Sequence, residues 1–523
     1  MSDWISATDL AALMSSDGLY AVFDIRERGE FNESQISFAT SLPRSQIEFR
    51  IGDLVPAPEI PVIVYGVGDG REQLAATTIE NLGYANVSIL TGGLSAWKDA
   101  HLLVVSGVNV PSKAFGERLQ HQENVPEITP QELKALQETS ADMVIFDLRT
   151  PEEYGRFCIP GAVNVPGGDL ILRAGDLRRH RTSNIIVNCA GRTRSIVGAA
   201  ALRRLGVSNA RALKNGTMGW VLAGFELESR PNRKTPEASE QSRDEAHSFA
   251  SSLQQQENIA SITAGGVADL LDRQNQTATY LIDVRSEPEY ESAHIEHSIN
   301  VPGGQAVQRA DDFIAVRNAK IVFVSGESSR ATMAAYWYRQ LGFRDVAVLE
   351  GGLRRWRESG FALASGIPAV QPLGVETALQ QTRRIAPAEV HELLENSSPL
   401  VLDVGSSADY ERGHLPAARW ISRSWLEIKI PEQFPDRRGE IILSCTDGQN
   451  SVFAAQALRS IGYVSASVLD GGVHQWIAGG YPLETGLTNC LIEPNDVVLS
   501  PSIKGDKEAM MRYLEWEEKL VTT

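Results

Sequence analysis

Residues 185–201 read Ile185-Ile186-Val187-Asn188-Cys189-Ala190-Gly191-Arg192-Thr193-Arg194-Ser195-Ile196-Val197-Gly198-Ala199-Ala200-Ala201. The first four residues are typical of a buried strand and the alanine-rich run of a helix, so Cys189 is expected at a strand-to-helix turn. Backbone N–H groups and the helix dipole favour an anion there, and Arg192 and Arg194 add positive charge. A fall in the thiol pKa from about 8.5 to about 6.5, worth roughly 2.7 kcal/mol, would make the thiolate dominant at neutral pH.

The same pattern occurs four times along the chain. A strand-like run ends in Asp24, Asp147, Asp283 and Asp403, and a glycine pair or its Asn-Gly variant precedes Trp97, Trp220, Trp356 and Trp476. Both markers recur at intervals of 123, 136 and 120 residues, so 73 residues separate the two markers in every repeat. This spacing predicts repeats at 1–107, 124–230, 258–366 and 380–488, with a linker at 231–257 and a C-terminal extension at 489–523.

Each repeat alternates near-continuous apolar strands with helices, which predicts an α/β fold in which helices cover both faces of a parallel sheet. Chemistry is then expected at the carboxyl ends of the strands, where the cysteine turn lies. Thr129, Pro130 and Glu132 form a helix start, and Ser6 and Asp9 offer a similar one in repeat 1.

The segments outside the repeats also carry signals. Residues 230–242 are polar and contain prolines, which is typical of a linker, and its position suggests that repeats 1 and 2 pack together, as do repeats 3 and 4. In the C-terminal extension, apolar residues recur at helical spacing and predict a helix docked on the body: Met510, Met511, Tyr513, Leu514, Trp516 and Leu520.

Composition narrows the possible partners. The chain has 523 residues and a formal charge of −17, which argues against nucleic acid or an anionic membrane surface as a partner. The start lacks a signal-peptide pattern and no apolar run reaches about 18 residues, so we expect a cytoplasmic protein. Four cysteines without zinc spacing, Cys158, Cys189, Cys445 and Cys490, predict no disulfide framework, no metal and no cofactor.

The four loops are unequal. The position 42 residues after each marker aspartate holds Gly66, Cys189, Ser325 and Cys445. Repeats 1 and 3 therefore lack a thiol nucleophile and are predicted to be non-catalytic. Cys445 is a possible second nucleophile with weaker activation, because Asp447 adds negative charge and Asn450 stands at the Arg194 position. Cys158 is expected to be a buried small residue, with a resolving thiol as the alternative.

Repeat 2 contains Asp147-Leu148-Arg149, Glu152-Glu153-Tyr154, Ile159-Pro160-Gly161-Ala162, the Cys189 loop and the Gly-Trp220 marker. With these motifs it resembles the rhodanese homology domain, a sulfurtransferase module. The resemblance covers nearly the whole chain except the linkers and the tail, and the arrangement is similar to rhodanese-related sulfurtransferases with four tandem domains. The resemblance implies that Cys189 accepts a sulfane sulfur from thiosulfate or a related small anionic donor, forming a persulfide. Cyanide, a small thiol or a protein thiol would then remove it. The substrate-binding loop is Ala190, Gly191, Arg192, Thr193, Arg194 and Ser195, with both arginines on the donor's sulfonate. Asp147 and Arg149 are expected to be a structural pair.

Two other functions remain open. One is phosphatase or arsenate reductase activity, because cell-cycle dual-specificity phosphatases share this fold. Their loop resembles Cys-x5-Arg, however, whereas Cys189 and Arg194 form Cys-x4-Arg. A sulfur-relay or scaffold protein could instead use the inactive repeats for binding. The physiological donor and acceptor and the oligomeric state are left open.

Overall fold

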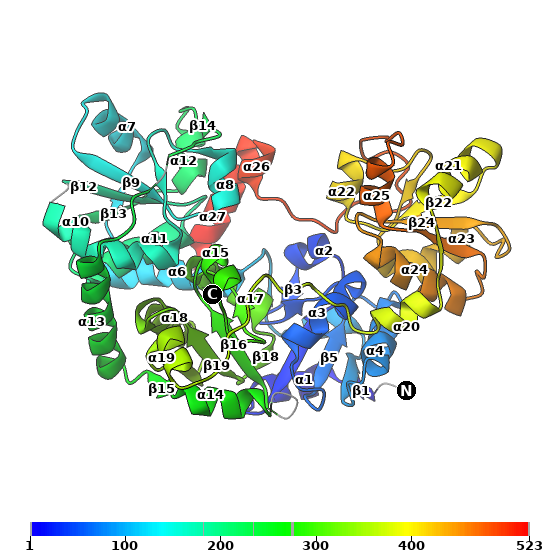
Figure 1. Ribbon diagram of the computed structural model, residues 1–523, viewed down its shortest axis with the longest axis horizontal. Coiled ribbons are helices and arrows are strands. Elements are labelled where there is room, and N and C mark those ends of the chain that lie inside the picture. The colour runs from blue at the N-terminus through cyan, green and yellow to red at the C-terminus, as the bar shows by residue number, and fades with distance from the viewer. Residues whose placement is uncertain (1–2, 181–182, 234, 274–276, 521–523) are drawn as a thin grey trace. The chain divides into compact units, whose positions relative to one another are not determined.

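The computed structural model describes residues 3–180, 183–233, 235–273 and 277–520. Met1 and Ser2 of the predicted first repeat, Lys234 of the predicted linker and residues 521–523 of the predicted extension lie outside them. The chain forms two compact units, Met1–Val108 with Ala369–Val498, and Asn109–Pro368 with Leu499–Thr523. Figure 1 shows the first unit in blue and yellow to orange, and the second in cyan, green and red. Repeat 1 thus pairs with repeat 4 and repeat 2 with repeat 3, so the pairing suggested by the linker is wrong.

Each repeat contributes five parallel strands to a sheet, and the order of these strands is the same in all four repeats. In repeat 2 the order is β11(Val163–Asn164), β9(Met143–Asp147), β12(Asn184–Asn188), β13(Ala210–Leu213) and β8(Glu127–Ile128). The corresponding strands are β4(Thr40–Ser41), β2(Tyr20–Asp24), β5(Val62–Tyr65), β6(Val87–Leu90) and β1(Asp3–Ile5) in repeat 1; β17(Ile299–Asn300), β16(Thr279–Asp283), β19(Lys320–Val324), β20(Val346–Leu349) and β15(Ala260–Ile262) in repeat 3; and β23(Arg419–Trp420), β22(Leu400–Asp403), β24(Ile441–Ser444), β25(Ala466–Leu469) and β21(Arg383–Ile385) in repeat 4. The predicted α/β class is confirmed.

Four helices recur in every repeat. The opening helices are α1(Ala7–Met14), α7(Pro130–Glu138), α14(Ala264–Leu271) and α21(Pro387–Asn396), and those after the marker aspartate are α2(Arg28–Glu33), α8(Pro151–Arg156), α15(Glu287–Ser292) and α22(Ser407–Arg412). The loop at the cysteine position leads into α4(Arg71–Asn81), α11(Thr193–Arg204), α18(Ser328–Gln340) and α24(Gln449–Ser460), and the tryptophan marker lies in α5(Gly93–Asp99), α12(Gly216–Leu222), α19(Gly352–Glu358) and α25(Gly472–Ala478). Thr129 caps α7 by accepting from the Glu132 amide, and Ser6 caps α1 through Asp9, as predicted.

Alternation along the strands builds a core on each face of the sheet. In repeat 4, Val401 and Ile442 pack with Trp476 on one face, whereas their neighbours Leu402 and Leu443 pack into a second cluster on the other. Side chains of successive strand residues point to opposite faces, so both faces need a helical cover. Helices α21 and α25 contribute to the first cluster, and α24 contributes to the second with α23(Leu426–Gln433) and α20(Val375–Gln380).

In both repeat pairs the two repeats contact each other through the segment that begins about 20 residues after the marker aspartate. In the first unit the contact is reciprocal, with Arg44 bonded to Glu427 and Arg423 bonded to Glu48. In the second unit glycines stand at the positions of Arg44 and Arg423, and a Cβ on Gly167 would lie 3.3 Å from the Cα of Gly304. Such reciprocal contacts are typical of a two-fold interface. At this surface, charged pairs therefore join repeats 1 and 4, whereas the backbones of repeats 2 and 3 approach each other closely.

The segments between repeats contain more helix than the sequence predicts. The interval expected to be a linker, 231–257, contains the 17-residue helix α13(Glu240–Gln256), whose N-cap Ser239 accepts from the Ser242 amide. Helix α6(Val110–Glu123) precedes repeat 2, and α26(Pro501–Lys504) and α27(Lys507–Lys519) lie in the C-terminal extension. Figure 1 shows α27 in red beside α6 and α12 of repeat 2.

Candidate functional site

Cys189 lies where predicted, directly after β12 and four residues before α11 begins at Thr193. Its Sγ is 3.5 Å from the Oγ of Ser195, in the first turn of α11. Its carbonyl oxygen accepts from the Thr217 amide at 2.9 Å. A Cβ at Gly216, which has φ +55°, would lie 2.3 Å from that carbonyl oxygen. The glycine of the tryptophan marker is therefore required so that α12 can approach the cysteine loop.

The two arginines of the loop are both bonded to carboxylates. Arg192 donates to Glu117 of α6, with an Nη2–Oε2 distance of 2.8 Å. Arg194 donates to both carboxylate oxygens of Glu153 of α8, at 2.7 and 2.9 Å. Burial alone would raise the pKa of Glu153, but the Arg194 charge lowers it to about 2, so this carboxylate stays ionised. That the arginines bind the donor stays a prediction, and such binding would have to share or displace these carboxylates.

The surroundings of Cys189 oppose the thiolate that the sequence predicts. Burial raises the pKa of the Cys189 thiol, the Arg194 charge and the Ser195 hydrogen bonds oppose this, and the Glu517 carboxylate adds to it. The side chain is 2% exposed. Sequence reasoning counted the arginine charges but not the carboxylates that neutralise them, nor the cover over the loop. With the loop covered in this way, the thiol form is favoured.

In repeat 1 the loop holds an internal carboxylate. Glu72, at the Ser195 position, accepts from the amides of Gly68 and Gly70, the latter at 3.3 Å. A Cβ at Gly66 would lie 2.6 Å from the Glu72 carboxylate, so a cysteine side chain would not fit beside it. The loop amides that would serve an anionic substrate are thus already used by the protein itself.

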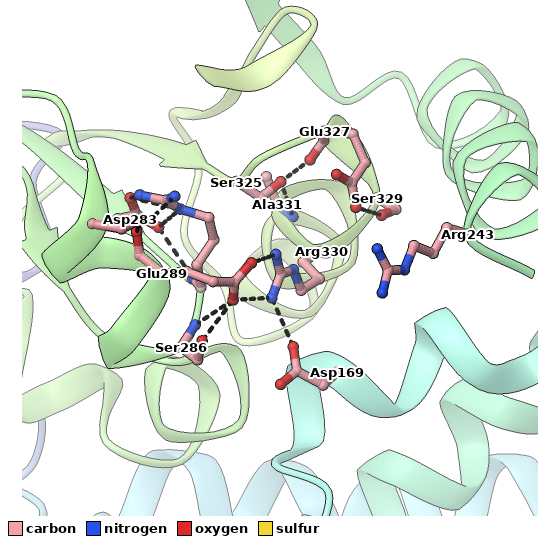
Figure 2. Close-up of polar contacts among 12 residues, drawn as sticks. Asp169, Arg243, Asp283, Ser286, Glu289, Ser325, Glu327, Ser329, Arg330 and Ala331 are labelled. Carbon is pink, nitrogen blue, oxygen red and sulfur yellow. Dashed lines mark hydrogen bonds and ion pairs between the residues drawn. The ribbon is translucent and has the colours of Figure 1, made fainter. Parts of the chain in front are cut away.

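In repeat 3 the loop arginine joins two repeats. Figure 2 shows Arg330 between Glu289, which it contacts at 2.6 and 2.7 Å, and Asp169 of repeat 2 at 2.7 Å. Ser325 stands at the cysteine position, where its Oγ accepts from the Ala331 amide at 3.3 Å. Because Arg330 pairs with Glu289 as Arg194 does with Glu153, this pair occurs where no thiol is present, which indicates a structural contribution.

In repeat 4 the loop keeps the thiol but loses the cations. The Sγ of Cys445 lies 3.1 Å from the Ser451 Oγ and 3.4 Å from its amide nitrogen. Burial raises the pKa of Cys445 to about 11, with Asp403 and Asp447 adding to it and Ser451 opposing it. Asn450 donates instead to the carbonyl of Val404 at 2.6 Å. These contacts agree with weak activation of Cys445.

The marker aspartates of repeats 1 to 3 each pair with the arginine two residues later. Arg149 donates to Asp147 at 2.9 and 2.7 Å, and the two side chains are 2% and 0% exposed. Asp24 with Arg26 and Asp283 with Arg285 repeat this geometry. The expected structural pair is therefore present as a buried ion pair below the loop.

Repeat 4 lacks this arginine, which gives Asp403 a pH-dependent effect on stability. Burial raises the pKa of Asp403 to about 6, against hydrogen bonds from the Gly405 amide and Ser444. Because the folded pKa exceeds the unfolded value of about 3.9, protonation of Asp403 stabilises the folded state. This contribution to the free energy of unfolding, roughly 3 kcal/mol, is complete below pH 4 and is lost as pH rises through 6. Asp403→Asn should flatten unfolding free energy against pH between 4 and 6. Asp470→Asn, at an exposed carboxylate, should not; an unchanged slope in Asp403→Asn would refute this.

The other cysteines have no reactive setting. Cys158 of β10(Phe157–Cys158) is fully buried in an apolar cluster, and burial raises its pKa to about 11. Its Sγ accepts from Arg233 at 3.3 Å, a contact that sequence analysis missed because Arg233 lay in the presumed linker. Cys490 is partly exposed, and burial raises its pKa as well.

Sequence analysis also missed what covers the Cys189 loop. Glu517 of α27 accepts from the Thr193 hydroxyl at 2.7 Å, and Gly116 of α6 packs on the same threonine. The apolar spacing of α27 predicted a docked helix but carried no information about its partner.

Among the described residues, no helix is long and apolar enough to cross a membrane. Within the same residues, no cluster of His, Cys, Asp or Glu is arranged to hold a metal ion.

Fold and site together define a class of protein with four tandem α/β domains, each with a loop between a central strand and the following helix, of which the loop in repeat 2 holds a thiol and two arginines. The model of the rhodanese-like domain family matches residues 6–100, 129–223, 263–359 and 386–479. The chain therefore belongs to the rhodanese-like family. Each matched interval falls within one of the predicted repeats.

Solved and curated relatives carry related names. The crystal structure of a thiosulfate sulfurtransferase from Pseudomonas aeruginosa matches with a TM-score of 0.92 and 34% identity, covering 99% of this chain and 97% of that one. The thiosulfate sulfurtransferase GlpE of Ectopseudomonas mendocina is 30% identical over 20% of this chain and 94% of its own length. A putative thiosulfate sulfurtransferase of Synechococcus elongatus is 21% identical over 41% of this chain and 82% of its own.

Proposed function

We propose that this protein transfers a sulfane sulfur from thiosulfate or a related small anion through a persulfide on Cys189 to cyanide or a thiol. The fold and the names of the relatives support sulfurtransferase activity in general. The observation that carries the proposal is that repeat 2 alone combines a thiol at the strand-to-helix turn with a loop arginine charge acting on it. Repeats 1 and 3 have Gly66 and Ser325 there, and repeat 4 has Asn450 in place of the arginine.

The chemistry proceeds in two displacements. The Cys189 thiolate attacks the outer sulfur of thiosulfate, a Cys–S–S bond forms, the S–S bond of the donor breaks, and sulfite leaves with its electron pair. The terminal sulfur then lies at the N-terminus of α11, where backbone N–H groups stabilise an anion. Cyanide or a thiolate attacks that sulfur, thiocyanate or a new persulfide forms, and the Cys189 thiolate is released.

The loop residues support this in different ways. The Ser195 Oγ accepts from the Cys189 thiol at 3.5 Å, and its own hydroxyl donates to the Arg192 carbonyl at 2.8 Å, which holds the turn in place. Ala190, Gly191 and Thr193 shape the turn, and Arg194 supplies a positive charge that favours the thiolate. We propose that Arg192 binds the sulfonate oxygens of the donor, exchanging its bond to Glu518, whose side chain is 48% exposed, for the incoming anion.

Steady-state kinetics test the proposal. Varying thiosulfate at several fixed cyanide concentrations should give parallel double-reciprocal lines, because sulfite leaves before cyanide reacts. No hydrolysis of an aryl phosphate is expected, which separates this activity from that of the related phosphatases. Intersecting lines, or phosphate hydrolysis without thiocyanate formation, would contradict the proposal.

A further inference from the structure

Helix α27 lies on the Cys189 loop and is attached there by several kinds of contact. Met510 and Leu514 form an apolar cluster with Met218 of α12. The ammonium group of Lys113 lies 4.8 and 4.7 Å from the ring centres of Tyr513 and Trp516. Glu518 accepts from Arg192 at 3.3 Å. All of these partners belong to the second compact unit.

The residue of α27 that meets the loop most closely is Glu517, which is 1% exposed. One carboxylate oxygen accepts from Thr193 at 2.7 Å. The other, Oε2, is buried and accepts no hydrogen bond from the described part of the chain. A Cβ placed on Gly191 would lie 3.2 Å from this Oε2. A carboxylate oxygen is thus held against the loop at the N-terminal end of α11, where an anion is favoured.

Burying the Glu517 carboxylate costs free energy that a helix serving only for packing would not need to spend. A buried carboxylate oxygen without a partner is unfavourable, and an apolar residue would seal the contact better. The cover also distinguishes repeat 2 from its neighbours. Gly191, Arg192 and Thr193 are all buried, whereas Gly68 in repeat 1 and Asp447 in repeat 4 are exposed at the position of Gly191. In repeat 1 a carboxylate also occupies the loop, because Glu72, which is part of the chain that follows the loop, accepts from the loop amides.

We propose that α27 is an autoinhibitory lid, in which the Glu517 carboxylate occupies the place of the donor's anionic group and must leave before a small anion can reach Cys189. The inference deepens, and rests on, the proposed use of an anionic sulfur donor at this loop. In repeat 1 the competing carboxylate directly follows the loop in the chain and cannot leave. In repeat 2 it is on a separate helix that can undock as a unit.

Alkylation of Cys189 tests the lid without any sulfur transfer. The full-length protein is treated with neutral iodoacetamide, and the modification rates of the Cys189 and Cys445 peptides are compared by mass spectrometry. Leu514→Asp, which puts a charge into the apolar contact, should raise the Cys189 rate about tenfold or more while Cys445 is unchanged. Met511→Asp is the matched control, because Met511 is 48% exposed on the same helix.

Glu517→Gln tests the carboxylate separately and keeps the side-chain shape, so that a folding defect in Leu514→Asp would not leave the lid untested. Removing the negative charge should raise the rate with anionic iodoacetate about tenfold relative to iodoacetamide. Glu515→Gln, at an exposed position of α27, should leave that ratio unchanged. A Cys189 rate within about twofold of wild type in Leu514→Asp, or an unchanged reagent ratio in Glu517→Gln, would overturn the proposal. Because neither readout uses thiosulfate, failure of the lid is distinguishable from failure of the proposed sulfurtransferase function.

Discussion

Cys189→Ser should lower the rate of thiocyanate formation from thiosulfate and cyanide by about a thousandfold or more. A serine hydroxyl cannot carry a persulfide, so the covalent intermediate is lost altogether. The Ser195 hydroxyl and the Arg194 charge remain in place but have no sulfur on which to act. The measurement is the initial rate of thiocyanate formation at saturating thiosulfate.

The matched control is Cys445→Ser in repeat 4, which should stay within about twofold of the wild-type rate. Burial raises the pKa of the Cys445 thiol to about 11, Asp403 and Asp447 add to this, and among the described residues no arginine opposes it as Arg194 does at Cys189. If Cys445→Ser instead removed most of the activity, the assignment of the principal site to repeat 2 would be wrong.

Arg149→Ala should reduce the unfolding free energy of the second compact unit by about 3–5 kcal/mol at pH 8. Arg149 also donates to the carbonyl of Phe157 at 2.6 Å, so its loss removes four side-chain hydrogen bonds and leaves the buried Asp147 carboxylate without its cation. The loss should be smaller at pH 5, because a buried carboxylate without a cation takes up a proton, as burial favours at Asp403. Urea unfolding at both pH values gives the comparison.

Two further variants separate the charge effect from lost packing. Asp147→Asn combined with Arg149→Ala should recover most of the loss, because no unpaired charge then remains. Arg156→Ala, at an exposed position of α8 in the same repeat, should change stability by less than about 0.5 kcal/mol. A double variant as unstable as Arg149→Ala would show that lost packing, not the orphaned carboxylate, dominates.

The fold was predictable because its signals are local and repeated. The marker aspartate ends a strand in all four repeats, and the glycine before the tryptophan is required by the carbonyl of the residue at the cysteine position. The pairing of repeats was predicted wrongly from the linker, although the sequence carries a better signal. Arg44-Ser45 and Arg423-Ser424 stand at the docking surface of repeats 1 and 4, where repeats 2 and 3 have Gly-Gly.

The cysteine loop was predictable in position but not in its electrostatics. The sequence shows Arg194 and Glu153 but not that they are bonded, although the same two positions hold Arg71 with Glu30 and Arg330 with Glu289. Repeat 4 changes both positions together, to Asn450 and Asp409. The position of α27 on the loop could not be predicted in this way, because that helix occurs once and its Glu517 bonds to a residue 324 positions away.

Intact-mass analysis after brief treatment with thiosulfate, followed by mapping of the modified peptide, shows directly whether Cys189 carries the transferred sulfur. We expect a gain of one sulfur atom, about 32 Da, located on Cys189, present in Cys445→Ser and absent in Cys189→Ser. No gain in the wild-type protein, or a gain located on Cys445, would contradict the proposed role of Cys189.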